Sequence, residues 1–191
     1  MKFTDGYWLL REGVTADHPA VVHEVVASDG GLDIHAPSQP IRHRGDLLKG
    51  PVVTISAHAP MPDVIGITFT HFEGDQPDGP EFTLARQEFT AHTGSDEDFA
   101  TLTSGALSVR FARTGPWQVD FLADGRVLTS SGTKNMGILR DATGAHYLRE
   151  QLNLTVGTSV YGLGERFGPL VKNGQVVDIW NADGGTATEQ A

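Results

Sequence analysis

The sequence predicts an all-β protein, an antiparallel β-sandwich with few or no helices. The 23 glycines and 10 prolines among the 191 residues divide the chain into short segments. Several of these segments alternate apolar and polar residues with a period of two. Such alternation places one face of a strand on a core and the other in water, as in antiparallel sheets. Asp-Gly pairs between alternating segments favour tight hairpin turns, because both residues tolerate positive φ.

The expected strands follow one another at short intervals. The first hairpin joins residues 21–26 to 32–35 through Asp29-Gly30-Gly31. In the next strand, 52–58, the residues Val53, Ile55 and Ala57 share one face. Further strands are expected at 64–72, 106–112, 117–122 and 127–129, the last two joined by a turn that contains Asp124-Gly125. Residues 81–93 fit a helix no better than a bent strand. The order of these segments predicts Greek-key or meander connections.

Composition and charge exclude several classes of function. The chain has no cysteine, which removes disulfides, thiolate nucleophiles and cysteine metal sites. Its formal net charge of −10 makes it a poor ligand for nucleic acid or for an anionic membrane surface. Neither an apolar run long enough to cross a bilayer nor a signal peptide is visible. We therefore expect a cytoplasmic protein whose partners include neither nucleic acid nor a membrane.

Local motifs for metals and cofactors are weak. The eight histidines are scattered and form no H-E-x-x-H or H-x-H motif. Of the two acidic segments, 73–81 and 94–98, the first suggests a calcium loop but lacks its spacing, so we expect solvated loops. Residues 161–168 have the spacing G-x-G-x-x-x-G, one residue away from a dinucleotide fingerprint, and no βαβ pattern surrounds them. We expect no metal site and no cofactor.

Two alternatives for the chemistry stay open at this point. No G-x-S-x-G motif marks a nucleophile, and no Ser–His spacing singles out a pair. A sugar mutarotase would instead need two histidines and a carboxylate in one cleft, which sequence order alone does not test. After Val160 the chain becomes rich in glycine, aspartate, asparagine and aromatic residues, the types that bind sugars. The same composition also suits a cluster of turns that closes a sandwich.

Two motifs near the end of the chain carry a resemblance to a known family. Residues 161–167, Tyr-Gly-Leu-Gly-Glu-Arg-Phe, resemble the Y-G-L-G-E-R-F stretch of glycoside hydrolase family 31. Residues 180–186, Trp-Asn-Ala-Asp-Gly-Gly-Thr, resemble a loop of its bacterial α-xylosidase branch. Residues 1–9, 79–80 and 117–122 are similar in kind, so the resemblance covers the whole chain.

The resemblance implies a division of labour. It implies that residues 1–175 form a galactose-mutarotase-like β-sandwich and that 176–191 belong to a loop reaching a (β/α)₈ barrel. In that family the barrel carries two catalytic aspartates and hydrolysis retains the anomeric configuration, which requires two closely spaced carboxyl groups. A barrel needs about 250 residues. We therefore expect no catalytic residue within these 191 residues, and no hydrolysis by this chain alone.

The same resemblance assigns one substrate-binding residue, Asp183. Its carboxylate could accept hydrogen bonds from two adjacent sugar hydroxyls. Ala182 and Ala187 stand where relatives often carry polar residues. A pair formed by Glu165 and Arg166 is expected to hold the root of the loop. Phe167 and Trp180 are as compatible with packing as with stacking on a sugar.

The expected function is that of the non-catalytic N-terminal domain of an α-xylosidase-like enzyme that hydrolyses terminal α-xylosyl residues. Its expected partners are the catalytic barrel and an α-xylosyl oligosaccharide. The alternatives are a stand-alone carbohydrate-binding or scaffold sandwich, a sugar mutarotase, and a parent enzyme that prefers α-glucosides.

Overall fold

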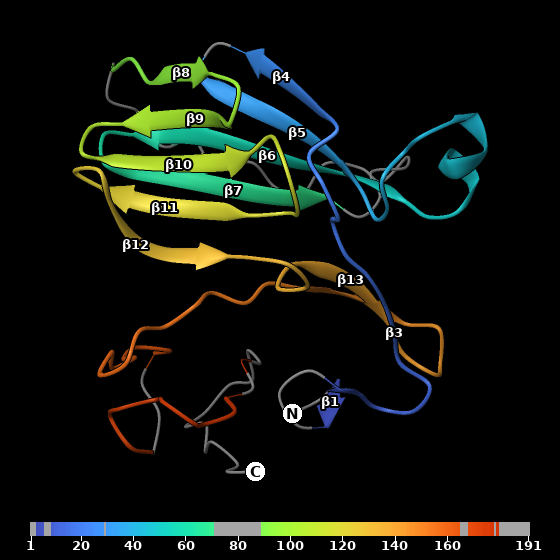
Figure 1. Cartoon of the computed structure of the whole chain (residues 1–191). Helices are drawn as coiled ribbons and strands as arrows, with labels where there is room; N and C mark the ends of the chain where they lie inside the picture. The colour runs from blue at the N-terminus through green and yellow to red at the C-terminus, as the bar shows by residue number, and fades with distance from the viewer. Residues whose placement is uncertain are drawn as a thin grey trace, which may run out of the picture. The chain divides into compact units, whose positions relative to one another are not determined.

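The computed structural model describes residues 3–5, 9–28, 30–70, 89–164, 168–177 and 179. The chain divides into two compact units: Thr15–Asn153, and a smaller one formed by Met1–Val14 with Leu154–Ala191. The larger unit contains the sandwich (Figure 1). The boundary expected at residue 175 stays a prediction.

One layer of the sandwich is a four-stranded antiparallel sheet in the order β4-β5-β6-β7. Its strands are β4 (Glu24–Ser28), β5 (Gly31–Pro37), β6 (Val52–Met61) and β7 (Val64–Thr70). The predicted alternation along β6 is confirmed, because Val53, Ile55 and Ala57 are all buried on one face. The expected hairpin between β4 and β5 is also present, with Ser28 paired to Gly31.

The other layer is a five-stranded antiparallel sheet in the order β12-β11-β10-β9-β8. Its strands are β8 (His92–Ser95), β9 (Phe99–Ser104), β10 (Leu107–Ala112), β11 (Val119–Ala123) and β12 (Arg126–Ser131). Asp124 and Gly125 connect β11 to β12 with φ values of 49° and 76°. Both values are positive, as a two-residue type I′ turn requires, so the predicted turn is confirmed.

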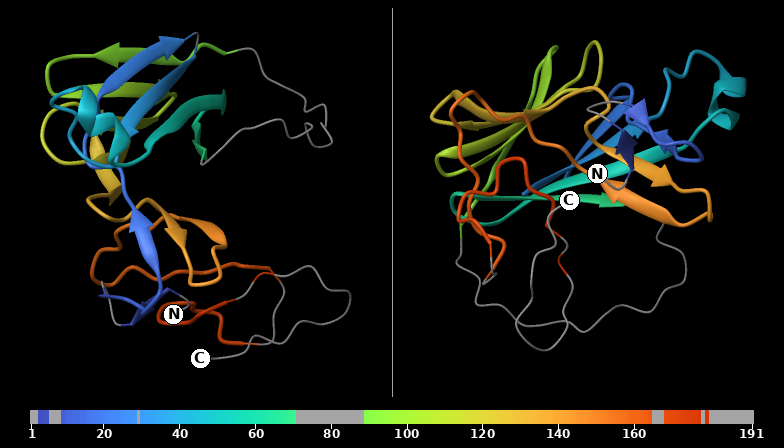
Figure 2. Two further views of the ribbon diagram at one scale, coloured as in Figure 1. Left: turned by 90° about the vertical axis from the view of Figure 1, so that its right-hand side faces the viewer. Right: turned by 90° about the horizontal axis from the view of Figure 1, so that it is seen from below.

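The core lies between these two layers. In Figure 2 the four-stranded layer is blue to teal and the five-stranded layer is green to yellow. Across the sandwich, β5 and β6 contact β9, and β7 contacts β10. Trp117 is 1% exposed and packs beside Phe111, with ring centroids 6.1 Å apart. The predicted antiparallel β-sandwich is thus confirmed, and the connections within each sheet are those of a meander.

A third, three-stranded sheet completes the larger unit, in the order β14-β13-β3. Its strands are β3 (Thr15–Asp17), β13 (Gly137–Arg140) and β14 (His146–Arg149). The described residues contain one short 3₁₀ helix, η1 (Arg44–Leu48), in agreement with the expectation of few or no helices. Of the ambiguous segment 81–93, residues 81–88 lie outside the described residues and 92–93 belong to β8.

The smaller unit holds the two short strands β1 (Thr4–Asp5) and β2 (Leu9–Leu10), which pair with each other. Near its other end, the backbone N–H of Lys172 donates to the carbonyl of Val160. In the part of the chain that the structure describes, no helix has the length and apolar character needed to cross a membrane. The cytoplasmic location stays a prediction.

Candidate functional site

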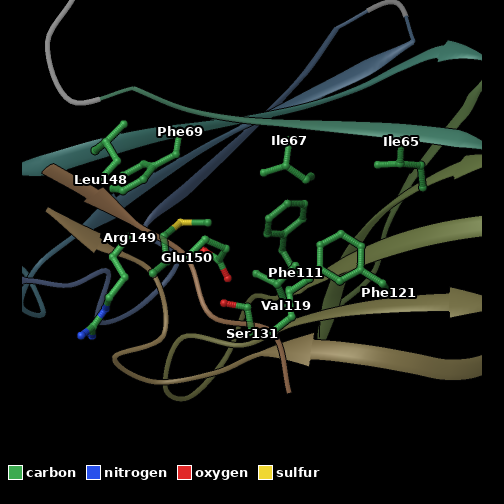
Figure 3. A pocket seen from close by; sticks show the side chains of 12 residues that line it. Ile65, Ile67, Phe69, Phe111, Val119, Phe121, Ser131, Leu148, Arg149 and Glu150 are labelled. Atoms are coloured by element: carbon green, nitrogen blue, oxygen red, sulfur yellow. The ribbon is translucent and has the colours of Figure 1, made fainter. Parts of the chain in front are cut away.

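A cleft of about 460 Å³ lies between the two layers of the larger unit. One wall is formed by β7, which contributes Ile65, Ile67 and Phe69. These three residues alternate along the strand, so their side chains point to the same side of the sheet. Figure 3 shows Ile65 and Ile67 on the side of the Phe111 and Phe121 rings, and Phe69 beside Leu148.

The opposite wall comes from the five-stranded sheet, from the residue before β13 and from the chain after it. The sheet supplies the rings of Phe111 and Phe121 together with Val119. Further apolar contacts come from Met136, Leu148 and Leu152. Leu148 and Leu152 are each 50% exposed, so they form the rim and not the floor of the cleft.

A carboxylate and a hydroxyl supply the polar chemistry of this cleft. Glu150 and Ser131 both line it, and their oxygen atoms point toward one another (Figure 3). Burial raises the pKa of the Glu150 carboxyl, while interactions with the Ser131 hydroxyl and the Gln151 backbone act in the opposite direction. Arg149 also lines the cleft, but its guanidinium extends away from this pair (Figure 3). The described lining of the cleft therefore offers a large apolar surface with a single carboxylate.

The position of Glu150 was missed in the sequence, although a signal exists. Leu148, Leu152 and Leu154 occupy alternate positions of one run, and Glu150 lies in the same phase. A carboxylate in the apolar phase of such a run indicates a charged group held against apolar surface. The run was not recognised as a strand, because β14 spans only four residues.

The histidines do not converge in the described residues in the way a mutarotase would need. The Nδ1–H of His18 donates to the carbonyl of Met136 at 2.8 Å, and His35 bonds with the Thr54 hydroxyl at 3.2 Å. None of the histidines that the structure describes lines the large cleft. A smaller recess of about 180 Å³ contains a single histidine, His146, next to Asp17 and Arg140.

One of the two acidic segments has a structural explanation. The Asp96 carboxylate accepts hydrogen bonds from the backbone N–H groups of Phe99 at 2.7 Å and Asp98 at 2.9 Å. These bonds lower the pKa of Asp96 and close the turn before β9. The segment 73–81 lies outside the described residues. Within the described ranges, no group of three or more His, Asp or Glu side chains is arranged to hold a metal ion.

The sugar-contact residue predicted from the resemblance, Asp183, lies outside the described residues. The same holds for Glu165, Arg166, Phe167 and Trp180, and for Ala182 and Ala187. Their assigned roles stay predictions. The structure does describe the start of the first motif, Tyr161–Gly164, where Gly162, Leu163 and Gly164 all have positive φ. Leu163, at φ 70°, adopts a left-handed conformation that is uncommon for a residue with a large side chain.

The base of this motif is fixed by Asn173. Its Oδ1 accepts the backbone N–H of Val160 at 2.7 Å, and its Nδ2 donates to the carbonyl of Thr158 at 2.9 Å. Asn173 therefore replaces the backbone partners that a strand would supply. Tyr161, immediately beyond this anchor, is 58% exposed.

Comparison with known proteins gives a consistent family assignment. Residues 53–191 match the sequence profile described as the glycosyl hydrolase 31 N-terminal galactose mutarotase-like domain. The chain is 38% identical over 192 aligned residues to the α-xylosidase XylQ of Lactiplantibacillus pentosus. It is 35% identical over 216 aligned residues to an α-xylosidase of Emericella nidulans. Both alignments cover the whole of this chain but only 25% and 27% of the relatives, so the chain spans about a quarter of their length.

Solved structures show the same fold at much lower sequence identity. The cycloalternan-forming enzyme of Listeria monocytogenes, solved with a pentasaccharide substrate, aligns with a TM-score of 0.61 and 16% identity. The uncharacterized protein lmo2446 from the same species gives the same TM-score and identity. Each alignment covers 89% of this chain and 15% of the other.

Proposed function

The chain belongs to the family of glycosyl hydrolase 31 N-terminal galactose mutarotase-like domains, and from this premise we propose that it is the non-catalytic N-terminal domain of a retaining α-glycosidase. The substrate of the parent enzyme is a terminal α-xylosyl residue of an oligosaccharide. The observation that carries this proposal is the similarity along the entire chain to two α-xylosidases. Because the chain spans a quarter of the length of these relatives, a parent of similar length would have enough further residues for a catalytic domain.

The chemistry of the cleft supports the non-catalytic role. Retaining hydrolysis needs two carboxyl groups about 5–5.5 Å apart, one acting as nucleophile and one as acid and base. Among the described residues that line the large cleft, Glu150 is the one carboxylic acid. The two catalytic aspartates are therefore assigned to a (β/α)₈ barrel in the rest of the parent protein, which is the main partner of this domain. Asp183 is assigned to the sugar contact, where a carboxylate can accept from two hydroxyls.

Hydrolysis of p-nitrophenyl α-xyloside tests this division of labour. The full-length parent and the 191-residue chain are assayed at equal molar concentration, with p-nitrophenyl α-glucoside as the comparison substrate. We expect turnover of the xyloside by the parent and none by the chain alone. Hydrolysis by the 191-residue chain would refute the non-catalytic role, and a parent faster on the glucoside would refute the substrate assignment.

A further inference from the structure

The two layers of the sandwich do not end at the same place. Across the core, β5 and β6 contact β9, and β7 contacts β10. The four-stranded sheet ends at β7, whereas the five-stranded sheet continues from β10 to β11 and β12 (Figure 1). The position beside β7 that would face β11 is occupied by no strand of the described residues. The large cleft lies there, since its walls are β7 and β11.

The free edge of β7 lacks the features that normally protect an edge strand. Its sequence, Val-Ile-Gly-Ile-Thr-Phe-Thr, contains no charged residue and no proline. Natural edge strands are usually short, charged, bulged or covered, because an uncharged edge invites pairing with another strand. Within the described residues β7 has one neighbouring strand, β6. The hydrogen-bonding groups on its other side therefore face away from the sheet.

The other edge strands of the sandwich are polar, carry a charged residue or are covered by another segment. The edge strand β8 is polar, with the sequence His-Thr-Gly-Ser, and β4 begins with Glu24. The edge of β12 is covered by a later segment of the chain. There the backbone N–H of Asn153 donates to the carbonyl of Ser130 at 2.9 Å, and the Thr129 hydroxyl donates to the carbonyl of Asn153 at 2.7 Å. Among the edge strands of the sandwich that the structure describes, β7 is therefore the one that is mainly apolar and is neither charged nor covered.

The lining of the cleft determines which side chains a strand paired with β7 must carry. A strand placed beside β7 would direct every second side chain toward β11. Those side chains would meet Phe121, Val119 and the alternating apolar residues of β7, so they must be apolar.

We propose that β7 is extended by a fifth strand that comes from the parent polypeptide outside these 191 residues and fills the cleft with alternate apolar side chains. This proposal rests on the proposed function, because it needs a parent longer than this chain. The relatives have about three times as much further chain as the part that aligns here. Addition of a strand to an exposed sheet edge is a common mode of recognition.

A second copy of the chain fits this edge less well. An antiparallel pair of β7 strands about a two-fold axis normal to the sheet would place both five-stranded layers on the same face. Because β11 and β12 extend beyond β7 in each copy, the two extensions would occupy the same space. A two-fold axis along the strands avoids this overlap but points the apolar residues of the two β7 strands to opposite faces, so the cleft would stay empty.

Amide hydrogen exchange in the full-length parent tests whether the edge is covered. We expect the amides of β7 to exchange at least about 100-fold more slowly than those of β8, a polar edge strand in the same molecule. The amides of the central strand β6 serve as the protected reference. Exchange of β7 as fast as that of β8 would overturn the proposal.

Cross-linking in the same protein identifies the occupant. Thr68, exposed on β7, is replaced by p-benzoyl-phenylalanine, with the same replacement of Thr93 on β8 as the matched control. After irradiation, mass spectrometry should find Thr68-site cross-links to peptides from outside residues 1–191, and Thr93-site products should lack them. Cross-links confined to residues 1–191, cross-links between two copies, or the absence of cross-links would each overturn the assignment. Hydrolysis of the α-xyloside is measured separately, so a failed strand assignment can be told from a failed function.

Discussion

At the scale of single residues, Asp120 is a carboxylate that links two strands of the sandwich by hydrogen bonds to charged and polar side chains. Its Oδ2 accepts the Nε–H of Arg110 at 2.9 Å, and its Oδ1 accepts the Nε2–H of Gln118 at 2.7 Å. Asp120 is 9% exposed, and the Arg110 guanidinium also lies 4.5 Å from the centre of the Phe99 ring. The carboxylate thus orders a guanidinium that covers an aromatic side chain.

Replacement of Asp120 by alanine should lower the free energy of unfolding of the 191-residue chain by about 1.5–3 kcal/mol, the usual range for hydrogen bonds to a charged group. Urea unfolding followed by far-UV circular dichroism measures the change. The matched control is Glu97→Ala, which removes an exposed carboxylate and should shift stability by less than about 0.5 kcal/mol. Equal effects of the two variants would show that the Arg110 contact adds nothing.

Two other carboxylates predict opposite dependences of stability on pH. Asp141 Oδ1 accepts the Thr143 hydroxyl at 2.6 Å and the Thr143 backbone N–H at 2.9 Å, and these bonds lower its pKa below the usual 3.8. Its stabilising contribution is therefore complete above pH 3.8 and is lost as the pH falls through the lower folded-state pKa. Burial instead raises the pKa of Glu150 above 4.5, so ionisation of Glu150 destabilises the fold as the pH rises.

Asp141→Asn should therefore be less stable than the unsubstituted chain at pH 7, and the difference should shrink below pH 3.8. Glu150→Gln should be more stable at pH 7, and its advantage should disappear below pH 4.5. Urea midpoints of the three proteins between pH 3 and pH 8 provide the measurement. Parallel curves across this range would contradict both assignments.

Prediction of the site from the sequence was uneven for a physical reason. Asp183 could be assigned a role only through the similarity of its surrounding motif, since no spacing within the chain indicates what it contacts. Glu150 could have been found from its place in the apolar phase of 148–154, but Ser131 could not. The meeting of Ser131 and Glu150 depends on how the chain after β14 returns past β12, a long-range arrangement without a local pattern.

At the scale of elements, strong local patterns predicted the strands well. The β11–β12 hairpin followed from alternation and from Asp124-Gly125, and β6 followed from its three alternating core residues. In the larger unit, the sequence did not predict β3, β8, β9, β13 and β14, and all of these except the six-residue β9 have only three or four residues. A segment that short shows too few alternations to be distinguished from a loop, and its pairing is fixed by partners distant in the sequence.

The unprotected edge of β7 makes a prediction about the isolated chain. Thr68→Lys places a charge on this edge and should raise the temperature at which the 191-residue chain begins to aggregate, because edge charges oppose strand pairing between molecules. The matched control is Thr93→Lys, an exposed threonine on the polar edge strand β8, which should have little effect. Light scattering during heating measures both. A larger gain from Thr93→Lys would mean that β8 is the edge that associates.

At the scale of the whole molecule, the fold class and the family were predictable because each depends on features spread along the chain. The period-two alternation recurs in many segments, and the two motifs at 161–167 and 180–186 are specific in combination. The unequal extent of the two layers was not predictable. It depends on which strand of one sheet faces which strand of the other, and alternation identifies only the buried face of each strand.

The last prediction concerns the full-length parent and follows from the proposed role of Asp183. Loss of a charged hydrogen bond to the sugar should cost about 1.5–3 kcal/mol in the transition state, which corresponds to a fall in kcat/KM of about 10- to 150-fold for Asp183→Ala. Asp183→Asn keeps the size and one acceptor oxygen but removes the charge, so its loss should be smaller. Glu97→Ala, far along the chain in an exposed turn of the sandwich, should leave kcat/KM unchanged. If Asp183→Ala matches the Glu97 variant in p-nitrophenyl α-xyloside hydrolysis, Asp183 does not contact the substrate. If kcat/KM falls while the urea midpoint stays constant, the loss is one of binding or catalysis and not of folding.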